Sequence, residues 1–150
     1  METIHDFEDL LMVLEKYQVR YLIIGGLAFI YHAKPRYTKD MDIWVEPETE
    51  NISRANQALS EFGSPYLLSS DNPREILQLG VAPDRIDILQ HVPGARFQTA
   101  WKNRIRESYG QVTANWIDID SLIRIKQKID NPKHKEDVRV LREVKKRRRR

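Results

Sequence analysis

Three aspartates inside apolar, strand-forming segments constrain this 150-residue chain more than any other feature. Asp40 and Asp42 belong to the run Thr38–Val45, and Asp87 belongs to Arg85–Leu89. Aspartate is depleted from β-strands and is seldom buried unless it is paired with a cation or bound to a ligand. Three such residues in one short chain therefore predict a compensating cation, and a divalent metal ion is the simplest one.

Strand geometry predicts that these carboxylates can meet. Residues i and i+2 of an extended strand point to the same face, so Asp40 and Asp42 lie side by side while the apolar residues around them face a core. The same alternation separates Asp87 from Ile86 and Ile88, so a neighbouring strand can deliver the third carboxylate. Three hard oxygen ligands in a chain without cysteine favour Mg²⁺ or Mn²⁺ over Zn²⁺.

A predicted anion site precedes the acidic segment. Val19–Ile24 has the pattern of a buried strand, Gly25 and Gly26 follow at once, and Leu27–Ala33 has the pattern of a helix. Glycine lets a phosphate approach the backbone without a clash with a Cβ atom, and the free N–H groups at a helix start favour negative charge. The glycine pair is also compatible with a simple tight turn between strand and helix.

The spacing of these motifs resembles a known pattern. Thirteen residues separate Gly26 from the run Asp40–Ile43, as in the glycine-pair and Asp-x-Asp motifs of the nucleotidyltransferase superfamily. The chain resembles a minimal nucleotidyltransferase of the DNA polymerase β-like superfamily, and within it the AbiEii-type, toxin-like group. The matching segments are Ile24–Ala28, Arg36–Asp42, Arg85–Leu89, Leu122–Lys126 and Lys135–Asp137. They span most of the chain.

The resemblance implies both a fold and an activity. The expected fold class is α/β (α+β), a mixed β-sheet flanked by helices with a helical C-terminal part. The expected activity is metal-dependent transfer of an NMP from an NTP to a hydroxyl acceptor, either an RNA end or a protein side chain. A toxin-antitoxin context, with a cognate antitoxin as partner, follows from the resemblance as well.

The same resemblance assigns roles to individual residues. The expected catalytic residues are Asp40, Asp42, Asp87, Lys126 and Asp137, and the first three are also the expected ligands of Mg²⁺ or Mn²⁺. Nucleotide binding is expected of four more residues, Gly25, Gly26, Arg36 and Thr38. In this scheme Asp87 orients or deprotonates the acceptor hydroxyl, and Lys126 neutralises charge on the leaving group.

Simpler structural roles remain open for these residues. Asp40 and Asp42 can cap a turn before the following strand, and Asp87 can pair with Arg85 or a lysine. Lys126 can be an ordinary solvated helical lysine, as can Lys39 in its loop. Asp137 can be a local partner on its own helix, of Lys133 or beside Arg139. The four histidines lack metal-ligand spacing and are expected to be structural or exposed: His5, His32, His91 and His134.

Charge is concentrated at the C-terminus. Removing the six basic residues Lys145–Arg150 changes the net charge from +3 to −3. We therefore expect a single domain over 1–144 and a basic tail over 145–150. Such a tail can bind nucleic acid or an acidic partner, or it can be a solvated helix end. Two alternatives to an enzyme follow: a non-catalytic binding module of the same fold, and an RNA-binding protein that works through the tail.

Hydrophobic periodicity predicts the order of elements. Helices are expected over 6–17, 27–33, 48–62, 95–103, 122–129 and after the break at Pro132, with strands over 19–24, 40–45, 75–81, 84–89 and one or two strands over 108–117. A hairpin-like turn is expected at Ala82-Pro83-Asp84. No apolar run reaches membrane-spanning length and no secretory signal is evident, so we expect a cytoplasmic protein. Because the chain is small, we expect a partner or a homodimer to supply the acceptor-binding surface.

Overall fold

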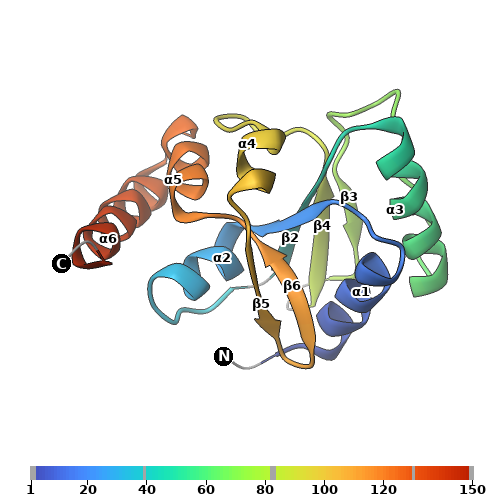
Figure 1. The fold of residues 1–150 in the computed structure, drawn as a ribbon, viewed down its shortest axis with the longest axis horizontal. Helices are drawn as coiled ribbons and strands as arrows, with labels where there is room; N and C mark the ends of the chain where they lie inside the picture. Colours follow the sequence, from blue (N-terminus) through green and yellow to red (C-terminus); the bar gives the residue numbers. More distant parts are fainter. Residues whose placement is uncertain (1–2, 39, 82–83, 130, 149–150) are drawn as a thin grey trace.

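The described residues of a computed structural model, 3–38, 40–81, 84–129 and 131–148, form six helices and six strands (Figure 1). The helices are α1 His5–Lys16, α2 Gly25–His32, α3 Thr49–Phe62, α4 Phe97–Lys102, α5 Ile119–Lys128 and α6 Pro132–Arg148. The strands are β1 Tyr21–Ile24, β2 Asp40–Val45, β3 Leu77–Leu79, β4 Arg85–Leu89, β5 Ile105–Tyr109 and β6 Val112–Trp116. This arrangement confirms the predicted mixed sheet with a helical C-terminal part.

The six strands form one sheet in the order β3-β4-β2-β1-β6-β5. The pairs β2–β4 and β1–β6 are parallel, and the other neighbouring pairs are antiparallel. β2 therefore lies between β1 and β4, so the two acidic segments are adjacent. This pairing, made across a long stretch of sequence, positions the site.

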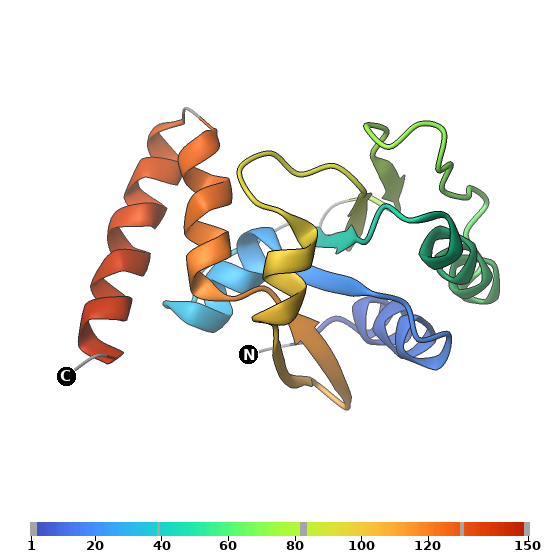
Figure 2. The ribbon, with the colours of Figure 1, turned by 45° about the horizontal axis from the view of Figure 1, so that its top comes forward.

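Helices cover both faces of the sheet. Figure 2 shows the α5–α6 pair on one flank of the molecule and α1 with α3 on the other. Met41, Ile43 and Val45 are fully buried in the core beneath α1 and α3, as the alternation along β2 predicts. On the opposite face Trp44 packs edge-on against Phe97 of α4, with ring centroids 5.2 Å apart. The face that carries Asp40 and Asp42 is thus polar only in the first half of β2.

Several element ends differ from the prediction. α2 begins at Gly25 itself, so the glycine pair forms the first turn of the helix instead of preceding it. α6 extends to Arg148, and Pro132 is its first residue, where the missing N–H of proline is harmless. The predicted strand region 108–117 is a hairpin, β5–β6, that begins earlier, at Ile105.

Two helix ends have a clear local cause. Gly63 ends α3 in the left-handed region, with φ of +99°, and the Asp118 carboxylate caps α5 by accepting from the Ser121 N–H. β3 is shorter than its predicted segment but pairs antiparallel with β4. Of the predicted turn between them, Ala82 and Pro83 lie outside the described residues. Among the described helices, none has both the length and the apolar character that a membrane crossing requires.

Candidate active site

The sheet register brings the three aspartates together. In the parallel pair β2–β4, Asp42 lies directly opposite Asp87, and Asp40 lies opposite Arg85. One carboxylate oxygen from each aspartate can be chosen so that all three atoms lie within 4.8 Å of one another. The side-by-side placement expected from strand geometry is therefore present, and the set of ligand atoms suits a hard divalent cation.

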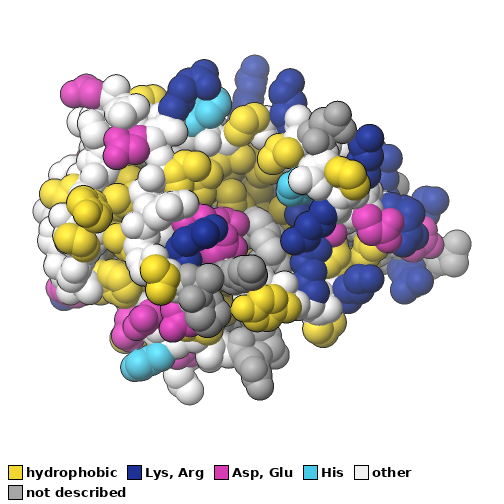
Figure 3. Space-filling model, turned by 180° about the vertical axis from the view of Figure 1, so that it is seen from behind, with side chains coloured by type: hydrophobic (Ala, Val, Ile, Leu, Met, Phe, Trp, Pro, Cys, Tyr) yellow, Lys and Arg dark blue, Asp and Glu magenta, His cyan; other side chains and the backbone are white. Residues whose placement is uncertain are grey.

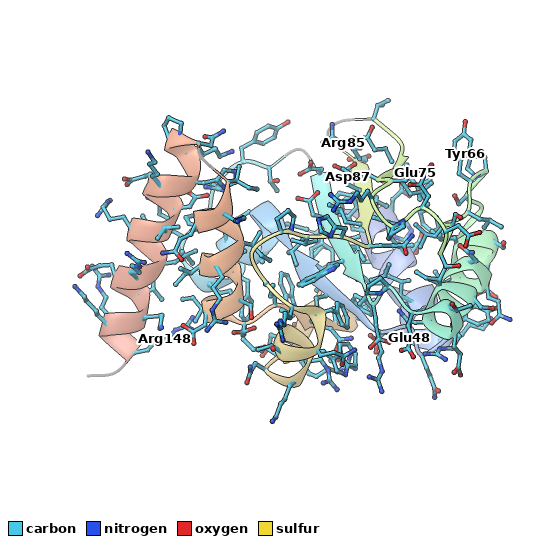
Figure 4. The ribbon with its side chains drawn as sticks, turned by 90° about the horizontal axis from the view of Figure 1, so that it is seen from above. Glu48, Tyr66, Glu75, Arg85, Asp87 and Arg148 are labelled. Atoms are coloured by element: carbon cyan, nitrogen blue, oxygen red, sulfur yellow. The ribbon has the colours of Figure 1, made fainter. Side chains whose placement is uncertain are left out.

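Arg85 pairs with two of these carboxylates. Its Nη2 donates to Asp40 Oδ2 at 2.7 Å and to Asp87 Oδ2 at 3.1 Å, and its Nε donates to Asp87 Oδ1 at 3.1 Å. The ion pair between Asp87 and Arg85 that sequence left open is thus present, and the contact with Asp40 is additional. Figure 4 shows Arg85 and Asp87 beside each other at one end of β4.

One guanidinium does not balance three carboxylates. Burial, together with the charges of Asp40 and Asp87, raises the pKa of Asp42 to about 7. Burial also raises the pKa of Asp87, although Arg85 opposes that shift. A group of oxygen donors with excess negative charge in a partly buried site is the environment in which a divalent cation binds.

The first turn of α2 closes tightly over the carboxylates. Gly25 has φ of +67°, and a Cβ atom built on it would lie 2.1 Å from Asp42 Oδ2. A Cβ atom on Gly26 would lie 2.6 Å from Thr38 Oγ1. No side chain larger than hydrogen fits at either position without movement, because the backbone approaches Asp42 and Thr38 so closely. The helix start and its free N–H groups thus adjoin the carboxylate cluster.

A second cluster of charged side chains lies beside α5 and α6. Asp137 of α6 accepts from Lys126 Nζ of α5 at 2.9 Å and from Arg36 Nη1 at 2.7 Å. The Arg36 guanidinium also stacks over the Phe29 ring, 4.0 Å from its centroid. Lys126 and Asp137 are each only about 5% exposed as side chains, so this is a buried pair.

Asp137 holds these cations instead of joining the carboxylate cluster. Although burial opposes it, the hydrogen bonds from Arg36 and Lys126 keep the pKa of Asp137 below its ordinary value. Asp137 therefore acts as a shared counter-ion that fixes two positive side chains. Neither of the partners considered for it from sequence, Lys133 and Arg139, makes this contact: Arg139 pairs with Glu136.

The two groups share one cleft of about 560 Å³. Its lining includes most of the expected site residues together with Arg85: Gly25, Gly26, Arg36, Thr38, Asp40, Asp42, Arg85 and Lys126. Asp87 lies beside it through its contact with Arg85, whereas Lys39 lies outside the described residues. Figure 3 shows acidic and basic side chains in contact in a hollow on this face, with hydrophobic side chains around it.

The cleft is also lined by four residues that the sequence analysis did not predict: Tyr37, Asn131, Lys133 and His134. For His134, helical spacing could have indicated this position, because His134 precedes the predicted site residue Asp137 by about one turn of α6. Its Nδ1 is buried without a hydrogen-bond partner among the described residues, and burial lowers its pKa. A histidine expected to be structural or exposed thus borders the candidate site.

A larger groove lies elsewhere. It has a volume of about 1020 Å³, runs between α3 and the loop after it, and half of its lining residues are serine, asparagine or glutamine. No member of the carboxylate cluster borders it. The smaller cleft is therefore the candidate active site, since the charged groups converge there.

Known structures share this fold, although neither a family model nor a curated protein matches the chain. A lincomycin-bound lincosamide antibiotic adenylyltransferase, LnuA, aligns with a TM-score of 0.60 at 14% identity over 95% of this chain and 99% of its own. ANT(2″)-Ia in complex with adenylyl-2″-tobramycin aligns with a TM-score of 0.57 at 12% identity over 90% and 84%. An antigenic nucleotidyltransferase-like protein from Paracoccidioides brasiliensis aligns with a TM-score of 0.57 at 14% identity over 93% and 74%. At such identities the comparison concerns architecture, and the chain has the nucleotidyltransferase fold.

Proposed function

We propose that this protein is a metal-dependent nucleotidyltransferase that moves an NMP from an NTP to a hydroxyl acceptor. The observation that carries the proposal is the convergence of Asp40, Asp42 and Asp87 within 4.8 Å at a cleft that also holds a glycine-lined helix start, the buried Lys126 and the partly buried Arg36. Carboxylates for a metal and N–H groups and cations for phosphates are the components that phosphoryl-group transfer requires. The nucleotidyltransferase fold of the chain agrees with this chemistry.

The transfer step exchanges one bond at the α-phosphorus for another. The acceptor oxygen forms a bond to the α-phosphorus, the bond from that phosphorus to the bridging oxygen breaks, and pyrophosphate leaves with the electron pair. Asp40, Asp42 and Asp87 would hold a Mg²⁺ or Mn²⁺ ion, whose charge would stabilise the transition state. The acceptor proton passes to a base, and we assign this role to Asp87.

The wall formed by the first turn of α2, Arg36 and Lys126 binds the triphosphate next to the carboxylates. Gly25 and Gly26 let phosphate oxygens approach the backbone N–H groups of α2. Arg36 and Lys126 neutralise charge on the leaving pyrophosphate, and Thr38 adds a hydroxyl donor at the same wall. Asp137 serves as the residue that positions Arg36 and Lys126.

The acceptor remains a choice among classes. The motif resemblance to the AbiEii-type group favours an RNA end or a protein hydroxyl, with a cognate antitoxin or a second copy of the chain completing the acceptor surface. The structural neighbours suggest small molecules as a further class of acceptor, because LnuA is an antibiotic adenylyltransferase and the structure of ANT(2″)-Ia contains adenylyl-2″-tobramycin. Each class is therefore supplied in the test.

The test is transfer of label from each of the four α-labelled ribonucleoside triphosphates in the presence of Mg²⁺. Total RNA, a cell lysate and a hydroxyl-rich small molecule are offered as separate acceptors. Asp42→Asn is the inactive variant, since it keeps the side-chain shape but loses the charge. Asp71→Asn, on an exposed loop, is the matched control.

Label that moves into an acceptor with the wild type and Asp71→Asn, but not with Asp42→Asn, supports the proposal and identifies the acceptor class. If no label moves, calorimetry of ATP with Mg²⁺ follows. Binding that Asp42→Asn abolishes indicates a missing acceptor. No binding at all contradicts nucleotidyl transfer and favours a non-catalytic module of this fold.

A further inference from the structure

Arg85 has an unusual position for a site that is to hold a divalent cation. Its guanidinium donates to carboxylate oxygens of the cluster, both on Asp40 and on Asp87. The cause lies in the sheet register. Arg85 is opposite Asp40 on the parallel neighbour strand and two residues before Asp87 on its own strand, so all three side chains share one face.

These hydrogen bonds use the oxygens that a metal would need. Both oxygens of Asp87 accept from Arg85, and so does Oδ2 of Asp40. Bidentate guanidinium–carboxylate pairs are directional and strong, and they satisfy the same lone pairs that a cation would coordinate. A bound divalent cation would also repel the guanidinium at this short range.

Arg85 can leave the cluster without disturbing the fold. Its side chain is 36% exposed, whereas those of Asp40 and Asp87 are 21% and 10% exposed. The guanidinium therefore already borders solvent. A change of side-chain rotamer suffices to free the carboxylates, because the backbone of β4 is fixed by β2 on one side and β3 on the other.

We propose that Arg85 is the resident counter-ion of the Asp40–Asp42–Asp87 cluster and is displaced when a divalent cation binds there. The inference rests on the metal site of the proposed function and deepens it, because it names the residue that sets metal affinity. It also links two events at the site. Displacement of Arg85 frees the oxygens of Asp87 for the acceptor hydroxyl at the moment the metal is in place.

The first experiment is a calorimetric titration of the full chain with Mn²⁺, without nucleotide. Arg85→Gln removes the competing charge and is expected to bind Mn²⁺ at least about tenfold more tightly than the wild type, since a nearby charge shifts such equilibria by one to three powers of ten. Arg85→Lys keeps a charge and is expected to bind closer to the wild type. Arg106→Gln is the matched control, because Arg106 is also partly exposed and paired, but with Glu15 on α1.

A second experiment observes Arg85 directly. Its Nε–H donates to Asp87, so its NMR signal is expected to be protected from exchange in metal-free protein. The signal is assigned by its absence in Arg85→Gln. Addition of Mg²⁺ is expected to shift the signal and speed its exchange in the wild type, but not in Asp42→Asn, which lacks a ligand. This readout needs no catalytic turnover.

Each outcome separates this inference from the proposed function. Wild-type binding of Mn²⁺ with no gain in Arg85→Gln, or with a loss, overturns the counter-ion role and leaves the metal site standing. Absence of Mn²⁺ binding in both proteins overturns the metal site and the inference together. If Arg85→Gln fails to fold, Arg85→Met, which keeps the aliphatic stem, takes its place, and the exchange measurement on the wild type decides independently.

Discussion

Gly25 is the residue at which close packing is most easily tested. It has a positive φ, and a Cβ atom there would overlap Asp42 Oδ2. Gly63 also has a positive φ, +99°, but a Cβ atom on it meets nothing within 4 Å. The two glycines therefore separate backbone strain from steric overlap with the acidic cluster.

We expect Gly63→Ala to lower the free energy of unfolding by about 1–2 kcal/mol, the usual penalty of the left-handed region. Gly25→Ala should lower it further and should also weaken Mn²⁺ binding, because Asp42 must move away from the added methyl group. Urea denaturation and Mn²⁺ calorimetry of both variants measure these effects. Equal losses of stability with unchanged Mn²⁺ binding would show that the first turn of α2 does not enclose the cluster.

The buried position of His32 predicts how the stability of the protein depends on pH. It is 3% exposed, its Nε2–H donates to the Ile117 carbonyl at 2.7 Å, and its Nδ1 is buried without a partner among the described residues. Burial lowers the pKa of His32 below the ordinary value of 6.5, although the hydrogen bond to Ile117 opposes the shift; the Arg148 charge also lowers this pKa and the Asp118 charge raises it.

The unfolded chain therefore binds a proton at His32 before the folded protein does. Stability from this residue is complete above pH 6.5 and falls as the pH drops from 6.5 toward the lower pKa of the folded state. His32→Gln, which keeps a donor but cannot titrate, should flatten this part of the stability curve measured by urea denaturation. His91→Gln, on an exposed loop, is the control, and an equal flattening by it would argue against His32 as the source.

At the scale of elements, α5 and α6 are joined at the site by a buried ion pair. Asp137 is shared by Lys126 and Arg36, which come from α5 and from the loop before β2. Removing one partner of a buried pair leaves an uncompensated charge, which usually lowers stability by about 3–5 kcal/mol. Asp137 thus fixes the helical pair to the sheet side of the cleft.

We expect Asp137→Asn to destabilise the protein by a large part of that amount and to weaken ATP binding. The double variant Lys126→Met/Asp137→Leu should recover much of the stability, because an apolar pair of similar volume replaces Lys126 and Asp137 while the partly exposed Arg36 can turn to solvent. It should not recover ATP binding. Denaturation and calorimetry on the single and double variants form the test. Full ATP binding by the double variant would contradict the assignment of Lys126 to the triphosphate.

Local patterns explain what sequence could predict. The shared face of Asp40 and Asp42 follows from strand periodicity, and the nearness of Gly25 to them follows from motif spacing. The contact of Arg85 with Asp40 was not predicted because it depends on the register of two strands that are not adjacent in sequence. The pairing of Asp137 with Arg36 spans 101 positions, for which helical spacing offers no signal.

The sequence also did not predict that β5 begins as early as Ile105. Arg106 and Glu107 interrupt the apolar pattern because that strand is at the sheet edge and most of its side chains are exposed. Edge strands need no continuous buried face, so hydrophobic periodicity underestimates their length. The core strands, by contrast, were recognisable from their apolar runs.

At the scale of the whole molecule, charge is divided between two parts. Residues 1–131 contain 15 Lys and Arg against 19 Asp and Glu, whereas residues 132–150 contain ten against three. Most of the second part is the ordered helix α6, and Figure 3 shows Lys and Arg side chains gathered on its flank. Its first turn borders the cleft through Lys133 and His134, so a basic surface leads away from the candidate site.

This polarity predicts that polyanion binding depends on α6. Arg142, Lys146 and Arg147 are exposed on that helix, and we expect the triple change Arg142→Gln/Lys146→Gln/Arg147→Gln to elute from heparin at lower salt than the wild type. For single-stranded RNA the dependence of log K on log salt should become shallower, by up to about 0.7 for each phosphate that the variant no longer neutralises. Thermal stability should change little, since exposed charges contribute weakly. The matched control is Arg74→Gln/Arg96→Gln/Lys102→Gln, which removes three exposed positive charges elsewhere. Equal weakening in both triple variants would show that net charge, and not the placement of charge on α6, controls the binding.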